Sequence, residues 1–303
     1  MWSCKSVRRS LQKQRHRNFI IFKKGGEFLI TFIGHVSKDV NVRKGRETIV
    51  PGGGVFYGAF PAKAFADEVK VVTKGNMDDK PLFSLFEEKG IKLVWLNSPS
   101  TTSIKNVYPT DNPDDRESRM ISRALPFQKE DIENISSKVI HVSPLWKGEF
   151  PEELFGILRE KCEVLSTDAQ GFLRNVDDAG NMYYKEWEKA KDTLRMIDVF
   201  KMDINEAKVL TGEEDPEKAL RTVHAMGPRE VILTYKDGVF LYIDEKLYHE
   251  SFSGWTIEGR TGRGDTCVAT YLAVRETRDP REALKVSAEI TSQKMKKPGP
   301  YIP

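Results

Sequence analysis

The chain has 303 residues, 39% hydrophobic and 31% charged, which is enough length and apolar content to bury a full core in one large domain. These values exclude a disordered chain, and no apolar run reaches the length of a transmembrane helix, so no membrane association is expected. The net charge is +3, but the first 30 residues hold eight Lys or Arg and one acid, a balance of +7, so the remainder carries −4 and its mildly acidic character argues against nucleic-acid binding.

Residues 1–28 are basic and lack a clear apolar period. They could be a targeting or nucleic-acid-binding arm, or a tail outside the folded domain. We expect a tail, because the first strand of buried type starts only at Phe28 and ends at Gly34. The folded domain is therefore expected to cover residues 29–303.

Strand-like and helix-like segments then alternate along the chain. Strands are expected at 69–73, 92–96, 139–142, 164–167, 199–202 and 231–234. Helices are expected at 55–65, 81–89, 151–161, 185–195, from 203 onward, and at 215–226. Two strands at 239–243 and 246–251 and two helices at 266–277 and 280–295 complete the chain. This alternation predicts an α/β fold with a mostly parallel sheet and crossover helices.

Two segments interrupt the alternation. Residues 98–123 combine an exposed-type strand at 100–108 with a polar, charged insertion, and residues 36–50 follow the first strand without helical character. A solvated loop would have a similar composition. We expect the two segments to form a small β flap, a lid over the site, whose open strand edges could also pair in a homodimer.

The stretch from Gly259 to Thr266 has the strongest chemical signal. Gly262 and Gly264 allow a tight turn and close approach to a ligand, and the helix that follows directs its free N–H groups into that turn. Asp265 lies in the same turn. An acid beside an anion site suits proton removal from a hydroxyl that attacks a phosphoryl group, whereas a plain helix entry is the alternative.

Other candidate residues follow the ends of predicted strands, where open α/β sheets bind ligands. Asp39 suits a polyol hydroxyl, with a turn aspartate as the alternative. The run Gly52, Gly53 and Gly54 opens the predicted 55–65 helix and allows close approach of a small polar substrate, with a flexible loop as the alternative. Asp168 and Arg174 come after the 164–167 strand, and Arg174 could clamp a phosphate or form only a surface ion pair.

Asp203 and Glu206 are three residues apart where a helix is expected to begin. This spacing is typical of a helix cap with an acid in the first turn. It equally presents two carboxylates to a hydrated Mg²⁺, which takes few protein ligands and keeps its waters.

Together these motifs resemble the ribokinase-like (PfkB) carbohydrate kinase family over about residues 29–300. The resemblance is carried, in order, by Gly52–Gly54, by 201–207, by Leu233 and Thr234 with Gly238, and by 261–265. It departs from the family pattern at Gly259 and Arg260, which stand in place of Asp-Thr, at Arg263 in place of Ala, and at Asp203 in place of Asn.

The resemblance implies a three-layer sandwich with a lid, and ATP-dependent phosphorylation of a hydroxyl with Mg²⁺. It implies that Asp265 is the general base, with Gly262, Arg263 and Gly264 around the anion hole. The implied roles of the other residues are substrate binding (Asp39, Gly52, Gly53, Gly54, Asp168, Arg174), nucleotide binding (Thr234, Gly238, Thr261) and metal binding (Glu206, Asp203).

Within the family, the phrases at 33–41, 143–146, 168–172 and 258–266 are most similar to the myo-inositol kinase branch. The implied substrate is therefore a small polyol, most of all myo-inositol. Ribose, a nucleoside such as adenosine, and a sugar phosphate are alternative acceptors. A different kind of function, a nucleotide- or polyol-binding sensor without turnover, is also an alternative.

Cysteine and histidine usage agrees with such an enzyme. Cys4, Cys162 and Cys267 are far apart, and the five histidines include no pair with ligand spacing. The pattern predicts a reducing, cytoplasmic compartment without disulfides, and a transition-metal site is not expected.

Overall fold

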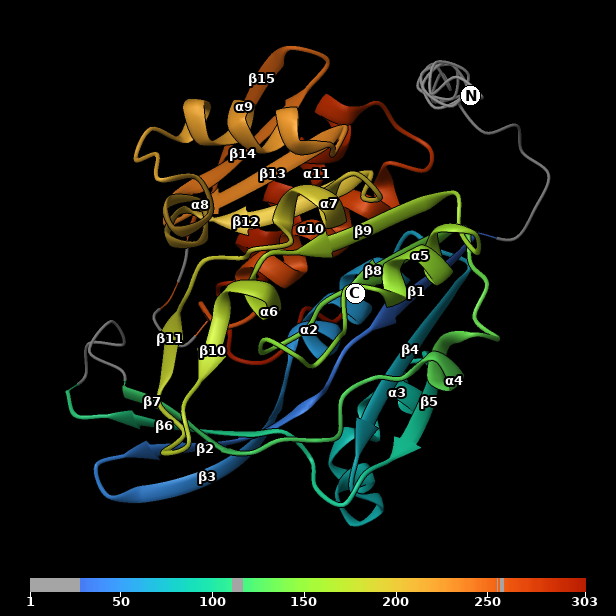
Figure 1. Cartoon of the computed structure of the whole chain (residues 1–303). Helices are drawn as coiled ribbons and strands as arrows, with labels where there is room; N and C mark the ends of the chain where they lie inside the picture. Colours follow the sequence, from blue (N-terminus) through green and yellow to red (C-terminus); the bar gives the residue numbers. More distant parts are fainter. Residues whose placement is uncertain (1–27, 111–116, 255, 257–258) are drawn as a thin grey trace.

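The computed structural model describes residues 28–110, 117–254, 256 and 259–303, and its centre is a nine-stranded sheet (Figure 1). The strands are, in chain order, β1 (Leu29–Ile33), β4 (Glu68–Gly75), β5 (Lys92–Asn97), β8 (Val139–Val142), β9 (Val164–Asp168), β12 (Val199–Asp203), β13 (Glu230–Tyr235), β14 (Gly238–Ile243) and β15 (Lys246–Ser251). Their order in the sheet is β15-β14-β13-β12-β9-β8-β1-β4-β5. All neighbours are parallel except β13 with β14 and β14 with β15, so the predicted α/β class is confirmed.

Helices cover both faces of this sheet and make a three-layer fold (Figure 1). One face carries α2 (Gly54–Lys63), α3 (Leu85–Glu88), α10 (Arg263–Val274) and α11 (Pro280–Lys294) over one apolar core. The other carries α4 (Lys129–Ile132), α5 (Leu154–Arg159), α6 (Gln170–Leu173), α7 (Ala190–Leu194), α8 (Ile204–Thr211) and α9 (Pro216–Met226) over a second core. The parallel strands are buried on both faces, which explains their continuous apolar sequences.

The lid is a separate four-stranded sheet of order β3-β2-β6-β7. Its strands are β2 (Ser37–Arg43), β3 (Arg46–Gly52), β6 (Ser103–Tyr108) and β7 (Glu117–Ser122). A short hairpin of β10 (Arg174–Val176) and β11 (Met182–Tyr184) meets β7 through a bridge between Arg119 and Asn181. The lid therefore rises from the carboxyl end of β1, beside the hairpin (Figure 1).

The order of the strands explains where a cavity can form. From β1 the chain runs to β4 and β5 on one side and to β8, β9 and β12 on the other. Parallel sheets of this kind open a crevice where the strand order reverses, outside the carboxyl ends. The lid and the N-terminus of α2 lie at that end of the sheet (Figure 1).

Several predicted elements have different bounds in the structure. The helix expected at 185–195 covers only Ala190–Leu194, and residues 185–189 are irregular or in a turn after the β10–β11 hairpin, which the sequence pattern did not reveal. The helix expected at 81–89 is a 3₁₀ segment, η2 (Met77–Phe83), followed by α3. The helix expected from Thr266 starts at Arg263, so Asp265 lies in its first turn.

Of the predicted N-terminal extension, residues 1–28, the structure describes only Phe28. Residues 1–27 and the insertion at 111–116 lie outside the described residues. Phe28, which was placed in the tail, is 6% exposed, belongs to the core, and donates its N–H to Asp67 at 2.8 Å. Over the part of the chain that the structure describes, no helix is both long and apolar enough to cross a membrane.

Candidate active site

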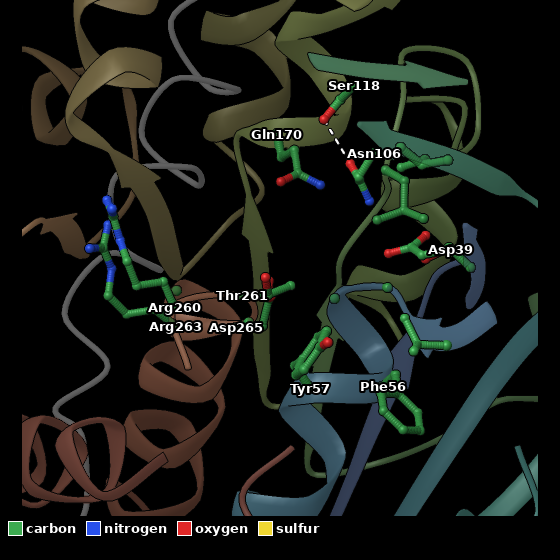
Figure 2. Close-up of a pocket in the computed structure, with 18 of the residues that line it drawn as sticks. Asp39, Phe56, Tyr57, Asn106, Ser118, Gln170, Arg260, Thr261, Arg263 and Asp265 are labelled. Atoms are coloured by element: carbon green, nitrogen blue, oxygen red, sulfur yellow. Dashed lines mark hydrogen bonds between the residues drawn. The ribbon is translucent and has the colours of Figure 1, made fainter. Parts of the chain in front are cut away.

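A cavity of about 860 Å³ lies between the lid, the first turns of α2 and α10, and the carboxyl ends of the central strands. Figure 2 shows Arg260 and Arg263 on one side, Asp39, Asn106 and Ser118 on the other, and Asp265 and Tyr57 between them. We call the first side the cationic end, made by Arg174, Lys201, Arg260 and Arg263, and the second the lid end, made by Asp39, Asn41, Asn106 and Ser118.

The first turn of α10 forms an anion-binding surface on the cavity wall. Its N-cap, Gly262, has φ 79°, a left-handed conformation that favours glycine. Arg263 N–H donates to the Arg260 carbonyl at 3.2 Å, and Thr266 N–H donates to the Gly262 carbonyl at 2.9 Å. The N–H groups of Gly264 and Asp265 have no carbonyl partner within the helix, so they and the helix dipole can receive negative charge.

Asp265 is the third residue of α10 and borders the cavity. Its position depends on close approach of the two helix N-termini. A Cβ atom at Gly54 would lie 3.2 Å from Asp265 Oδ1 and 2.1 Å from Ser143 Oγ. Gly54 therefore has to be a glycine for α2, Asp265 and the end of β8 to meet at one point.

The lid end is a set of neutral and acidic hydrogen-bonding groups on strands β2, β6 and β7. Ser118 Oγ donates to Asn106 Oδ1 at 2.7 Å, and Asn106 Nδ2 donates to Asn41 Oδ1 at 3.1 Å. Gly52 does not border the cavity, but a Cβ atom there would lie 2.6 Å from Asp39 Oδ2. Its role is to leave room for the Asp39 carboxylate.

A buried polar network lies beneath the cavity floor. Ser143 Oγ donates to Asp168 Oδ2 at 2.6 Å, and His141 Nε2 is 4.0 Å from the same oxygen. Burial lowers the pKa of His141 to about 3, so its ring is neutral. Burial raises the pKa of Asp168 to about 7. The nearby Lys201 acts to lower this pKa, and the nearby Asp265 acts to raise it. Asp168 is 1% exposed and does not border the cavity, so it orders Ser143 and its neighbours from below.

Lys201 is the cation at the centre of this network. It lies on β12, is 6% exposed, and has its Nζ 3.6 Å from Glu206 Oε2. A Cβ atom at Gly264 would lie 3.0 Å from the same Nζ, so the ammonium lies directly under the first turn of α10. Burial alone would lower the pKa of Lys201, but the carboxylates of Glu206 and Asp168 outweigh it and raise the pKa above its ordinary value.

Asp203 and Glu206 form a reciprocal cap at the start of α8. Asp203 Oδ1 accepts the N–H groups of Asn205 and Glu206, both at 2.8 Å, and Glu206 Oε2 accepts the Asp203 N–H at 2.7 Å. Asp203 borders the cavity, whereas Glu206 is 1% exposed and does not. Within the described ranges, no group of three or more His, Cys, Asp or Glu could hold a metal ion. These residues therefore fit a hydrated Mg²⁺ beside Asp203, but no direct carboxylate cage.

Charge at the cationic end comes from four side chains on different elements. Arg263 Nη1 donates to the Lys236 carbonyl at 3.4 Å, and burial, with the nearby Arg260, lowers the pKa of Arg263. Arg174 enters from β10, and Lys201 from β12. Thr234, at the end of β13, lies near Gly264 and completes this wall.

The structure therefore brings most, but not all, of the expected site residues to one cavity. Those that border it are Asp39, Gly53, Gly54, Arg174, Asp203, Thr234, Thr261, Gly262, Arg263, Gly264 and Asp265. Those that do not are Gly52, Asp168, Glu206 and Gly238. Gly238 starts β14, where a Cβ atom would lie 2.6 Å from the carbonyl oxygen of Glu250 on β15. The close packing of these two strands therefore accounts for a glycine at this position.

Residues that sequence reasoning missed include Lys201, Asn106, Ser118 and Tyr57, all of which border the cavity. Lys201 had a usable signal, because a lysine within the apolar strand 199–202 is costly to bury without a charged partner. Asn106 and Ser118 had none, since their facing positions depend on the pairing of β6 with β7.

Comparison with known proteins agrees with this arrangement. The model of the pfkB family carbohydrate kinases matches residues 24–303. A solved pyrophosphate-dependent kinase in the ribokinase family, in complex with a pyrophosphate analogue and myo-inositol, is 42% identical, with a TM-score of 0.84 over 90% of this chain and 97% of that one.

Two further relatives broaden the comparison. One is a structure described as the conversion of a pyrophosphate-dependent myo-inositol-1 kinase into a myo-inositol-3 kinase by replacing an asparagine and a serine with leucine. It is 41% identical, with a TM-score of 0.83, and covers 90% of this chain and 95% of that one. The other is the cytidine kinase of Thermococcus kodakarensis, 27% identical over 292 residues, 90% of this chain and 98% of that protein. Since the family model spans nearly the whole chain and the fold is ribokinase-like, this chain belongs to the pfkB family of carbohydrate kinases.

Proposed function

We propose that this kinase transfers a phosphoryl group from pyrophosphate to one hydroxyl of myo-inositol. The observation that carries the proposal is the position of Asp265, between a lid end of hydrogen-bonding groups and a cationic end beside free helix N–H groups. A polyol hydroxyl and a phosphoryl donor can meet at such a boundary, and an acid there can accept the hydroxyl proton.

The choice of donor departs from the ATP expected from the sequence. A nucleotide divides its binding contacts between base, ribose and phosphates, whereas pyrophosphate offers only charged oxygens. Four cationic side chains and a helix N-terminus converge on one end of the cavity, which suits a donor held by charge alone. The structures at 41% and 42% identity are those of pyrophosphate-dependent kinases, which supports the same choice.

In the proposed reaction, Asp265 accepts the proton of the attacking hydroxyl as that oxygen bonds to phosphorus. The bond from phosphorus to the bridging oxygen breaks, and orthophosphate leaves. The N–H groups of Gly264 and Asp265, with Lys201 beneath them, hold the charge that develops on the transferred group. Asp203 would hold a hydrated Mg²⁺ through its waters, and the bound ion would neutralise donor charge.

The lid end determines which hydroxyl faces Asp265. Asn106 and Ser118 are hydrogen-bonded to each other and border the cavity on adjacent strands. In the related inositol kinase, replacing an asparagine and a serine with leucine changes the 1-kinase into a 3-kinase. We infer that Asn106 and Ser118 have that role here and favour the 1-phosphate.

The test is a donor and acceptor panel with the purified full chain and Mg²⁺. The donors are pyrophosphate and ATP, and the acceptors are myo-inositol, ribose, cytidine and fructose 6-phosphate. Turnover with pyrophosphate and myo-inositol is the expected result. Turnover with ATP alone would overturn the donor, and turnover with cytidine alone would overturn the acceptor and favour the nucleoside kinase that the 27% identical relative represents.

A further inference from the structure

Lys294, the last residue of α11, is a second buried lysine near the anion-binding turn, and it does not border the cavity. It is 3% exposed. Its Nζ donates to the Gly259 carbonyl at 2.5 Å and to the Thr261 carbonyl. The ammonium thus joins two carbonyls of the loop that leads into the first turn of α10.

The same ammonium lies over the ring of Tyr57, and that ring packs against Gly262. Lys294 Nζ lies 5.3 Å from the centroid of the Tyr57 ring, and a Cβ atom at Gly262 would lie 2.2 Å from that ring. Tyr57 is therefore held between the lysine and the N-cap of α10. A cation against an aromatic face is attractive, and more so when both are desolvated.

The end of α11 supports this loop at further points. Thr256 N–H donates to the Met295 carbonyl at 2.8 Å, and a Cβ atom at Gly259 would lie 1.9 Å from that oxygen. Within the loop, the Gly259 N–H donates to Thr256 Oγ1 at 3.2 Å, and Thr256 Oγ1 in turn donates to the Met295 carbonyl at 3.1 Å. The conformation of the loop, and hence of the anion-binding turn, depends on α11.

We propose that Lys294 is a positioning residue, a built-in cation that fixes the Gly259–Thr261 carbonyls and the Tyr57 ring and so shapes the anion site at the start of α10. Both of its readouts rest on the proposed function, because calorimetry uses pyrophosphate as the donor and turnover uses the proposed phosphoryl transfer. A neutral side chain of similar length would leave two carbonyls without a cation and allow the turn to shift. Displacement of about 1 Å at a reacting centre can lower a rate by about 10²-fold.

The charge of Lys294 titrates in an accessible range. Burial lowers the pKa of Lys294 to about 8, against a smaller opposing effect of Asp265 on α10. The other groups that face it are the Tyr57 ring on α2 and the carbonyls of the loop, where Arg260 borders the cavity. As pH rises through about 8 the amine becomes neutral, so the anion site should lose its support and activity should fall.

The test compares Lys294→Met, Lys294→Arg and Lys294→Ala with Lys297→Met, an exposed control three residues away. Pyrophosphate binding is measured by calorimetry without acceptor, and turnover is measured with the donor and acceptor that the panel identifies. We expect Lys294→Met to lose about tenfold or more in kcat/KM and in pyrophosphate affinity, while Lys297→Met loses neither. Ammonium or potassium ions should restore part of the activity of Lys294→Ala.

Two results would overturn the proposal. One is a Lys294→Met protein whose pyrophosphate affinity and kcat/KM both stay within twofold of the wild type. The other, which applies even if the neutral variants fail to fold, is a fall in activity above pH 8 that is identical in the wild type and Lys294→Arg. The panel tests the wild type and the variants test Lys294, so a wild type without the proposed turnover and a Lys294→Met protein that matches the wild type are separate failures.

Discussion

The lid end and the cationic end of the cavity are built from different chemistry on different elements. At the lid end, Asn41, Asn106 and Ser118 form a chain of neutral hydrogen bonds across three strands of a small sheet. At the cationic end, charged side chains from β10, β12 and α10 converge beside helix N–H groups. Neutral hydrogen-bonding groups at fixed strand positions can select one arrangement of substrate hydroxyls. Concentrated positive charge binds a small anion mainly through its charge.

The two ends also differ in how they are supported. The lid end belongs to a separate sheet, which meets the β10–β11 hairpin through the bridge between Arg119 and Asn181 and through a small apolar cluster that includes Met120 and Met182. The cationic end rests on buried groups, with Lys201 below α10 and Lys294 behind its entry loop. Substitutions at the lid end should therefore change selectivity, and those at the cationic end should change rate and donor affinity.

The largest effect is expected at the boundary between the two ends. Asp265→Asn keeps the size and the helix position of the side chain but cannot accept a proton. Removal of a positioned base typically lowers kcat by about 10²–10⁴-fold. Steady-state kinetics should show this loss, while calorimetry should show that myo-inositol and pyrophosphate still bind.

The next effect concerns the buried charge of the cationic end, that of Lys201. Lys201→Met removes the ammonium under Gly264 and should lower kcat by about 10²–10³-fold, the range seen when one charge-stabilising donor is lost. Lys208→Met, on the exposed surface of α8, is the matched control.

Loss of fold is the main competing explanation for Lys201→Met, because it leaves Glu206 and Asp168 without their buried cation. The double variant Lys201→Met/Glu206→Gln removes one of these charges and should regain stability without regaining activity. Recovery of activity together with stability would assign Lys201 a structural role only.

A smaller effect, on stability, should come from Asp168 below the boundary. Its folded pKa, raised by burial to about 7, exceeds the unfolded value, so the folded state holds the extra proton between about pH 4 and pH 7. Stability should therefore fall as pH rises through this window, by about 1.4 kcal/mol per pH unit. Urea unfolding should show the wild type losing about 2–3 kcal/mol relative to Asp168→Asn between pH 5 and pH 8. A constant difference would contradict the raised pKa.

The smallest change in rate, but a change of product, is expected at the lid end. Asn106→Leu with Ser118→Leu removes the hydrogen-bonded pair that borders the cavity and should keep kcat/KM within about tenfold. Separation of inositol phosphates by chiral chromatography should show a different isomer as the main product. An unchanged isomer would mean that regiochemistry is set elsewhere, with Asp39 the next residue to test.

The comparison also separates what the sequence could predict from what it could not. Alternating apolar strands and helices predicted the central sheet, and the glycine turn before Asp265 predicted the start of α10 to within three residues. Both are local patterns. The lid was expected from polar composition, but its strand pairing, and hence Asn106 facing Ser118, depends on contacts between distant segments.

Buried cations were the least predictable part of the site. Lys294 ends an amphipathic helix, where a lysine usually complements the helix dipole at the surface. Its burial arises because the loop from Gly259 folds back over that helix end, 33 to 35 residues away in sequence. Glu206 is buried as well, caps the start of α8 and lies 3.6 Å from Lys201 Nζ, and its role as a metal ligand stays a prediction.

The central claim is that Asp265 promotes the transfer of one phosphoryl group from pyrophosphate to a myo-inositol hydroxyl within a single cavity. Phosphorus-31 NMR of the wild type with Mg²⁺, pyrophosphate and myo-inositol tests it most directly. We predict that the pyrophosphate signal is replaced by equal amounts of orthophosphate and a single inositol monophosphate, and that Asp265→Asn leaves it unchanged. Orthophosphate in twofold excess over consumed pyrophosphate, without an inositol phosphate, would reveal hydrolysis and contradict the account.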